Sequence, residues 1–201
     1  MNISPTKSNL LATKRALVFA EEGYTLLNRK RNVLIREIMQ LIDDAREVQE
    51  SIETVFARAY SSLQKANLSI GIEYVEELGF SIPENDSISY RLRSVMGVEV
   101  PSIEEIDENI EPSYGFFRTN TNLDQAFKAF QKALSLIARL SEIETTVYKL
   151  SVEIKKTQRR VHALEKVLIP QYKALVKFIE SYIEETERDD FFRMKMLKAR
   201  R

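Results

Sequence analysis

The sequence predicts a mainly α-helical protein: a long antiparallel two-helix coiled coil, closed at one end by a small connector that contains a β-hairpin. Three observations predict this fold. Two long segments, residues 6–67 and 121–200, each contain a single helix-breaking residue. In both, apolar residues recur at alternating steps of three and four, which is the seam of a coiled coil. Most of the glycines and prolines lie between them, in residues 68–120.

The first helix is expected to begin after Pro5, with Thr6 or Ser8 as the N-cap, and to continue to about Asn67. Gly23 is the only helix breaker within it. A helix with one apolar stripe on an otherwise polar surface needs a partner to cover that stripe. The seam residues of this helix are Leu34, Ile38, Leu41, Ala45, Val48, Ile52, Val55 and Ala59.

The connector differs in kind from the two helices, because glycines and prolines interrupt it repeatedly. A short helix is expected over Ile72–Leu78. The segment Ile88–Val95 alternates apolar with polar residues, which is the period of a half-exposed strand. Val98–Val100 and Tyr114–Arg118 are both candidate partner strands, and the pairing is left open. A small hairpin is therefore predicted within the connector.

The second helix is expected to run from Thr121 to about Arg200, about 120 Å at 1.5 Å per residue. Beyond Leu168 the apolar step becomes four and four, through Tyr172, before the alternation resumes. Such an insertion locally unwinds a supercoil, and Pro170, beside it, is expected to bend the helix. The seam residues are Val147, Leu150, Ile154, Thr157, Val161, Leu164 and Leu168, followed by Leu175, Ile179 and Tyr182.

The two long helices are expected to be antiparallel neighbours, because a parallel pair would need a return crossing of ~90 Å. If Leu68 faces Thr121, the numbers of facing residues sum to about 189, and Gly23 lies near Lys166 and Pro170. The second helix is the longer one, so its C-terminal turns should project beyond the first. The predicted domains are an N-terminal coiled-coil helix (1–68), a connector (69–120) and a C-terminal coiled-coil helix (121–201).

Composition narrows the class of protein. Charged residues make up 30 % of the sequence, the formal net charge is zero, and there is no cysteine. Disulfides and thiolate metal sites are thereby excluded, and a reducing cytoplasm is compatible. No apolar run reaches the ~18 residues that a membrane-spanning helix needs, so work at a membrane is expected to go through partners. The charges are uneven: basic residues predominate among the charged residues of 1–36, the last eleven residues hold five basic and no acidic side chains, and acidic residues predominate in 71–117.

No motif indicates a catalytic residue, a cofactor or a metal. None of the glycines belongs to a phosphate-binding loop or a dinucleotide-binding turn. His162, the only histidine, is expected to be an ordinary surface side chain, because no pocket accompanies it. The acidic run from Glu184 to Asp190 radiates around a helix, whereas hard cations need ligands that converge from a loop. Ion pairs with neighbouring basic residues explain this run more simply.

Two clusters of basic residues are expected to face each other across the seam. They are Arg29, Lys30 and Arg31 on the first helix and Lys155, Lys156, Arg159 and Arg160 on the second. Nucleic acid is a poor candidate partner, because the net charge is zero and no aromatic residues are interleaved. A protein surface that carries carboxylates fits better, and solvation of an exposed helix face remains the alternative.

Four segments in combination resemble a known family, the D subunits of the V-type and archaeal-type rotary ATPases. These segments are Pro5–Leu34, Val95–Pro101, Lys156–Pro170 and Glu187–Lys195. The resemblance extends over nearly the whole chain, and its specificity lies in the spaced combination. Two positions depart from the pattern. His162 stands where asparagine is usual, and Asp189 and Asp190 stand where glutamates are usual.

The resemblance implies a central rotor shaft, a non-catalytic subunit that couples ATP hydrolysis or synthesis to proton or sodium translocation through a membrane ring. The implied partners are ATPase subunits A and B of the catalytic head, the small F subunit, and a membrane-side socket subunit of the C or d type. The implied location is cytoplasmic and peripheral to the membrane, without direct insertion, and neither cofactor nor nucleic acid is expected. The candidate head-binding residues are Arg29, Lys30, Arg31, Arg159, Arg160, Phe191, Phe192 and Met194.

A prefoldin-like coiled-coil chaperone or adaptor is the principal alternative, because it also combines two helices with hairpins. The helices predicted here are longer than such a chaperone needs, and the basic termini suit insertion better than the clasping of unfolded chains. A structural homodimeric coiled coil is a further alternative, and an enzyme in its own right has almost no support. Co-purification with ATPase subunits or with unfolded clients would separate these classes.

Overall fold

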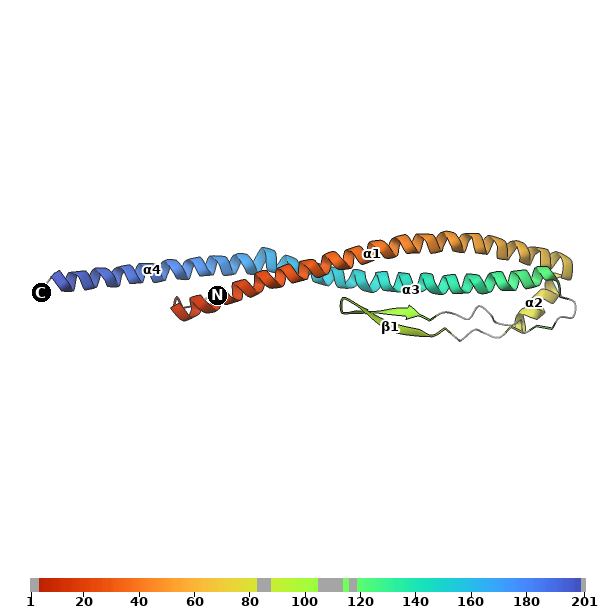
Figure 1. Cartoon of the computed structure of the whole chain (residues 1–201), viewed down its shortest axis with the longest axis horizontal. Helices are drawn as coiled ribbons and strands as arrows, with labels where there is room; N and C mark the ends of the chain where they lie inside the picture. Colours follow the sequence, from red (N-terminus) through yellow and green to blue (C-terminus); the bar gives the residue numbers. More distant parts are fainter. Residues whose placement is uncertain (1–3, 83–87, 105–113, 116–118, 200–201) are drawn as a thin grey trace. The chain divides into compact units, whose positions relative to one another are not determined.

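A computed structural model describes residues 4–82, 88–104, 114–115 and 119–199 of the chain. It confirms the predicted class, mainly α-helical with one small antiparallel hairpin (Figure 1). The elements in chain order are α1 (Lys7–Ile70), α2 (Ile72–Phe80), β1 (Tyr90–Val95), β2 (Val98–Ile103), α3 (Thr121–Ala163), a π-helical turn η1 (Leu164–Leu168) and α4 (Ile169–Ala199).

The chain forms two compact units. Unit 1 contains residues 1–33 and 154–201, and unit 2 contains residues 34–153. Each long helical segment therefore contributes to both units. The division into an N-terminal helix, a connector and a C-terminal helix as separate domains stays a prediction.

In unit 1, the beginning of α1 runs antiparallel to α4. Ion pairs join Lys7 Nζ to Glu187 Oε1 at 2.6 Å and Lys14 Nζ to Glu180 Oε1 at 2.6 Å. Residue numbers rise along α1 as they fall along α4, and each pair sums to 194 rather than to the expected 189. Two causes make this sum larger than the seam alone predicts. Lysine and glutamate side chains reach diagonally across the flank of a helix pair. The π-helical turn η1 also adds one residue to the second helix.

The π-helical turn occurs where the sequence predicts local unwinding. The amide N–H of Ile169 donates to the carbonyl oxygen of Leu164, five residues back, so this turn holds one residue more than an α-helical turn. Pro170 follows directly and has no N–H to donate at this point of the continuous helix. The change of step in the seam is thus absorbed by a wider turn.

Burial confirms the predicted seams. Leu34, Ala59 and Leu150 are fully buried, and every predicted seam position of α1 is buried or half-buried. Thr157, the polar member of the second seam, is buried as well. Tyr182 is the exception, because it is exposed near the end of the paired region.

The closed end of unit 2 has its own small core. Ala66, Tyr114 and Leu123 are buried there and are covered by half-buried side chains from α1, α2 and α3, namely Ile70, Val75, Leu78 and Phe127. The hydroxyl of Tyr114 donates to Asp124 Oδ1 at 2.7 Å. Burial, together with this hydrogen bond, raises the pKa of the Tyr114 hydroxyl.

Two further contacts define the register of unit 2. Asn120 Nδ2 donates to Ser69 Oγ at 3.2 Å, so the numbers of these two residues sum to the predicted 189. The ring of Tyr60 on α1 meets the ring of Phe130 on α3 edge to face, with centroids 5.5 Å apart. The helices of unit 2 are therefore antiparallel, close to the predicted register.

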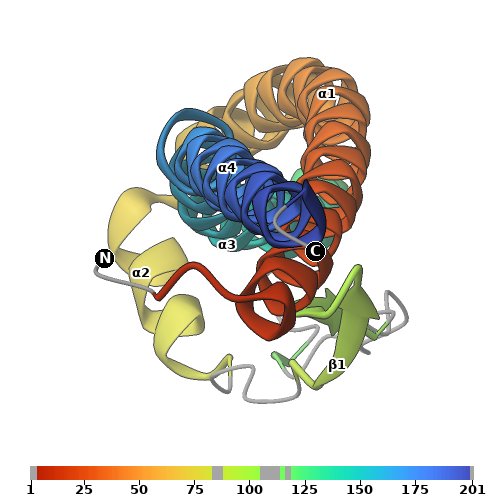
Figure 2. The ribbon, with the colours of Figure 1, turned by 90° about the vertical axis from the view of Figure 1, so that its left-hand side faces the viewer.

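The chain leaves α1 at Gly71, whose φ of 100° strongly favours glycine. Helix α2 follows (Figure 2). The short helix predicted over Ile72–Leu78 is thereby confirmed, and the observed helix continues to Phe80. Strand β1 pairs with β2 in antiparallel register, Val95 opposite Val98, so the candidate partner that follows directly in sequence is the correct one. Met96 and Gly97 both have positive φ, which makes the two-residue loop a type I′ turn.

The hairpin buries side chains mainly through β2. Val100 is fully buried, whereas the residues of β1 are exposed as far as Ser94 and not merely on alternate faces as predicted. The amide N–H of Ile103 donates to Glu142 Oε2 at 3.0 Å and so attaches the base of the hairpin to α3. In the other candidate strand, Tyr114 belongs to the core described above, and residues 116–118 lie outside the described part.

Candidate functional site

Unit 1 carries the predicted head-binding residues on a helix pair with a regular charge pattern. Lys7, Lys14 and Glu21 are seven residues apart on α1, and their partners on α4 are also seven apart. The third pair, Lys173 Nζ to Glu21 Oε1 at 2.9 Å, has the charges reversed. We call these three pairs the ion-pair ladder. Charges at heptad spacing on the flanks of a seam determine register and orientation, so the ladder specifies the antiparallel alignment of unit 1.

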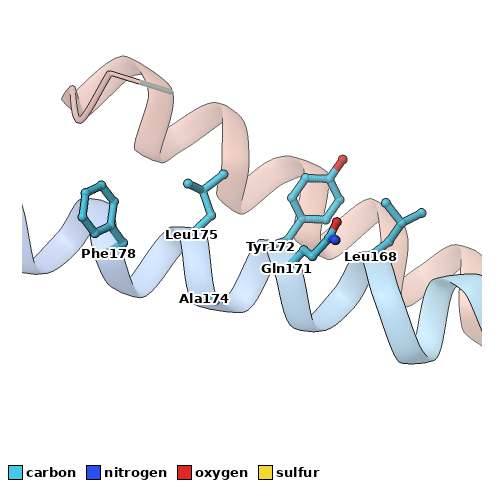
Figure 3. A pocket seen from close by; sticks show the side chains of 6 residues that line it. All are labelled: Leu168, Gln171, Tyr172, Ala174, Leu175 and Phe178. Atoms are coloured by element: carbon cyan, nitrogen blue, oxygen red, sulfur yellow. The ribbon is translucent and has the colours of Figure 1, made fainter. Parts of the chain in front are cut away.

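An open groove of about 470 Å³ lies along η1 and α4 (Figure 3). Its lining is mostly apolar and comes from one face of the helix: Leu168, Gln171, Tyr172, Ala174, Leu175 and Phe178. On α1, Gly23 has open space where a side chain would stand. Exposed apolar side chains, including Phe19, Leu26 and Phe178, occur on both helices of this unit. A partner protein could bury them.

The last turns of α4 extend beyond the paired region. Glu187 is the last residue of the ladder, and α4 continues to Ala199 (Figure 1). The rings of Phe191 and Phe192 have centroids 6.4 Å apart, and both rings are exposed. Met194 and the nearby apolar side chains are also exposed. An exposed apolar helix end of this kind needs a protein environment to cover it.

The predicted basic residues have unequal surroundings. Arg29, Arg159 and Arg160 are exposed, whereas Lys30 and Arg31 are half-buried. Lys30 already has an interaction partner. Nη2 of Arg31 lies 3.4 Å from Asn32 Oδ1, and its Nε is buried without a hydrogen bond to the described residues. Only the three exposed arginines therefore offer a full cationic surface, and the binding role of all five stays a prediction.

His162 is exposed, as expected for an ordinary surface side chain. Within the acidic run, Glu187 pairs with Lys7, and Asp190 lies 3.8 Å from Arg193, one helical turn away. Among the described residues no three His, Cys, Asp or Glu side chains gather in a way that could hold a metal ion. No helix in the described ranges is both long and apolar enough to cross a bilayer.

Reasoning from the sequence did not find the ladder. Its signal was present, since Lys7, Lys14 and Glu21 recur every seven residues and so do Lys173, Glu180 and Glu187. The two series become complementary only with facing numbers that sum to 194, and the seam alone does not give that offset.

Paired helices with exposed apolar and cationic faces define a helical subunit that acts through contacts with other proteins. Residues 9–199 match the family of ATP synthase D subunits. The D subunit of the V-type ATP synthase of Thermotoga neapolitana is 48 % identical over 200 residues, which cover 100 % of this chain and 98 % of that protein. The D subunits of the A-type ATP synthases of Pyrococcus furiosus and Thermococcus sibiricus are 37 % and 36 % identical, over 99 % of this chain and 94 % of each relative.

The chain belongs to the family of ATP synthase D subunits. The resemblance noted in the four sequence segments is thereby confirmed, and the chain is a subunit of a V/A-type rotary ATPase.

Proposed function

We propose that this chain is the central rotor shaft of a V/A-type rotary ATPase. It is a non-catalytic subunit that transmits torque between the catalytic head and the membrane ring, and so couples ATP hydrolysis or synthesis to proton or sodium translocation. The ion-pair ladder of unit 1 is the observation that carries this proposal. A helix pair that transmits torque must resist sliding of one helix along the other, and three ion pairs at heptad spacing oppose such sliding.

Unit 1 is the part that enters the head formed by subunits A and B. Its exposed apolar side chains, including Phe191, Phe192 and Met194, support this assignment, because each would otherwise face water. Arg29, Lys30, Arg31, Arg159 and Arg160 meet acidic loops of the head as the shaft turns. Arg29, Arg159 and Arg160 are exposed, and exposed charges on a turning surface suit repeated, weak contacts, since pairs of this kind contribute only ~0.2–1 kcal/mol each.

Unit 2 provides the contacts with the F subunit and with the membrane-side socket of the C or d type. Leu68, Ile72 and Phe80 are strongly exposed around the closed end and support a docking role there. The chain works in the cytoplasm at the membrane surface, held there by its partners and not by insertion.

Rotation of the chain relative to the head is the direct test. The sequence has no cysteine, so Leu68→Cys introduces a single thiol at a side chain that is 89 % exposed. A bead or gold particle is attached to this thiol in the complex of the chain with the head subunits, and the head is fixed to a surface. ATP is expected to drive the particle in one direction through full turns.

A cysteine in a head subunit, labelled in the same way, is the matched control and should give a static particle. If the head hydrolyses ATP while the particle on Leu68→Cys stays still, the chain is not the rotor. Directed rotation of the control particle alone would lead to the same conclusion.

A further inference from the structure

One stretch of unit 2 is basic and carries no compensating acid. Residues 54–70 of α1 and 125–141 of α3 contain no aspartate or glutamate. We call their five exposed cations the basic band: Arg58, Lys65, Lys128, Lys132 and Arg139. The two nearest carboxylates of α3 are already engaged, because Asp124 accepts from Tyr114 and Glu142 accepts from the N–H of Ile103. The band therefore has no carboxylate of its own.

A groove of about 510 Å³ lies beside two members of this band, Arg58 and Lys65. It is lined by Ala57, Arg58, Ser61, Ser62, Lys65, Gln125 and Ala129. Two of the lining residues are basic, and most of the others have short side chains. Short side chains let another backbone approach closely, and the serine hydroxyls and the Gln125 amide offer hydrogen bonds to it. The backbone of a partner segment can therefore approach this groove, with Arg58 and Lys65 beside it.

The register of unit 2 places like charges across from each other. Tyr60 and Phe130 are in ring contact, and Lys65 and Gln125 line the same groove; both pairs sum to 190. The same sum places Arg58 across from Lys132. Facing like charges disfavour the pairing of two helices. In unit 1 the ion-pair ladder instead places lysine across from glutamate, so this chain elsewhere uses flank charges to stabilise its own pairing.

None of the five cations makes an ion pair with the part of the chain that the structure describes. Like charges without acidic partners lower the stability of the isolated chain, and a bound protein surface that carries carboxylates would offset this loss.

We propose that the basic band is a docking surface for an acidic helix of another subunit of the complex. Arg58 and Lys65 are seven residues apart on α1, which is roughly 10 Å along the helix axis. Two carboxylates seven residues apart on a partner helix have the same spacing and can pair with both. The partner helix lies along the groove and buries its small side chains. The proposal rests on membership of the complex and does not require rotation.

An acidic protein fits the surroundings of the band better than a nucleic acid does. Residues 71–117 of the same chain carry eleven Asp and Glu residues and only Arg91 and Arg93 as cations. A polyphosphate chain would be repelled by this neighbouring segment in sequence, whereas a protein helix can confine its negative charge to one face.

Binding measurements with the full chain test the proposal. The double variant Arg58→Glu plus Lys65→Glu is immobilised, and the other soluble subunits of the complex, each purified separately, are passed over it. For one of these subunits, the affinity of the double variant is expected to be at least tenfold lower than that of the parent chain. The affinity of Arg58→Gln plus Lys65→Gln for the same subunit is expected to lie between the two. The parent's affinity for that subunit should fall steeply with added salt, and the variant's less so.

Arg46→Glu is the matched control. Arg46 is also exposed on α1 in unit 2, but four acidic residues lie within four positions of it in the sequence, and its reversal should leave every affinity unchanged. Equal affinities of parent and double variant for all subunits would overturn the proposal, even if the rotation experiment succeeds. Loss of binding in both the double variant and the control would also overturn it, since the effect would then not belong to the band.

Two measurements separate other occupants. The melting temperature of the isolated double variant is expected to equal or exceed that of the parent, because the repulsion between Arg58 and Lys132 is removed. A clear fall would mean that the chain's own acidic connector covers the band. Salt-sensitive binding of the parent to duplex DNA or to anionic phospholipid vesicles, abolished in the double variant, would replace the acidic helix by a phosphate-bearing partner.

Discussion

Lys14 on α1 and Glu180 on α4 form an ion pair of 2.6 Å, and both side chains remain partly exposed. They stand seven residues from Lys7 and Glu187 in their respective helices, in the same relative orientation. Neither pair contributes much alone, because exposed ion pairs are worth little. Their common spacing is what matters, since a register shift of one residue would misalign every pair together.

Exchange of the two charges tests this role. Lys14→Glu places two carboxylates across from each other and is expected to lower the free energy of unfolding of the chain by about 0.5–1 kcal/mol. Lys14→Glu combined with Glu180→Lys restores an ion pair and should recover most of that loss. Urea denaturation of the four proteins of this double-mutant cycle measures the coupling. Arg15→Glu, an exposed position outside the ladder, is the control, and an equal loss there would show that only net charge matters.

The exposed arginines of unit 1 should affect coupling between ATP turnover and ion transport. Arg159→Glu plus Arg160→Glu replaces attraction to acidic loops of the head by repulsion, and we expect roughly fivefold less ion transport per ATP hydrolysed in a reconstituted complex. Lys177→Glu, an exposed change on α4, should have a smaller effect. Unchanged coupling with the variant chain still bound in the complex would contradict the assignment of these arginines to the head.

Tyr114 gives the closed end of unit 2 a dependence on pH. Its pKa is raised above its usual value of about 10 by burial and by the hydrogen bond to Asp124. The unfolded chain ionises this hydroxyl at lower pH than the folded chain does. Its contribution to stability is therefore complete below a pH of about 10 and falls as the pH rises above that value.

Tyr114→Phe removes the titrating group and leaves Asp124 without its donor. At pH 8 we expect a loss of about 1 kcal/mol in the free energy of unfolding. Between pH 9.5 and 11, values chosen to bracket the ordinary tyrosine pKa of about 10, the variant should lose less stability than the parent. Chemical denaturation at several pH values measures both effects, and Tyr148→Phe, at an exposed position, is the control. If the free energy of unfolding fell equally with pH in the parent and in Tyr114→Phe, the inferred pH dependence would be contradicted.

Much of the fold could be predicted from periodicity, because a seam is a local property of the sequence. Leu34 and Leu150 have the apolar neighbours that steps of three and four require, and both are fully buried. The wider turn at η1 was harder to predict. The stutter and Pro170 locate the irregularity, but a supercoil can absorb an insertion by underwinding or by a π-turn, and both have the same sequence signature.

The interaction surfaces could be predicted only in part, because they depend on the register. The run Arg29–Arg31 is visible in the sequence since its charges are consecutive. Arg58 and Lys132 are isolated cations in two distant segments, and they form one surface only after the helices of unit 2 are aligned. The ion-pair ladder and the basic band both depend on how two helical segments that are distant in sequence are aligned. Local sequence patterns do not specify that alignment, so neither surface could be predicted.

The hairpin tip stores backbone strain that a substitution can relieve. Met96 has a φ of 50°, a left-handed conformation that costs most L-residues about 1–2 kcal/mol, whereas asparagine tolerates it through local hydrogen bonds. A type I′ turn prefers Asn-Gly at these two positions, and Gly97 already occupies the second. Met96→Asn is therefore expected to stabilise the hairpin by about 1 kcal/mol. Met96→Leu keeps the strain and should give no gain.

Amide hydrogen exchange in the paired residues of β1 and β2 measures this locally, because the hairpin can open without unfolding of the long helices. Slower exchange at Arg93 and Val100 in Met96→Asn, with unchanged exchange in α3, is the expected result. Gly97→Ala places a side chain at a φ of 79° and should accelerate exchange at the same amides. If Met96→Asn exchanges no more slowly than Met96→Leu, the left-handed conformation at Met96 is not a source of strain.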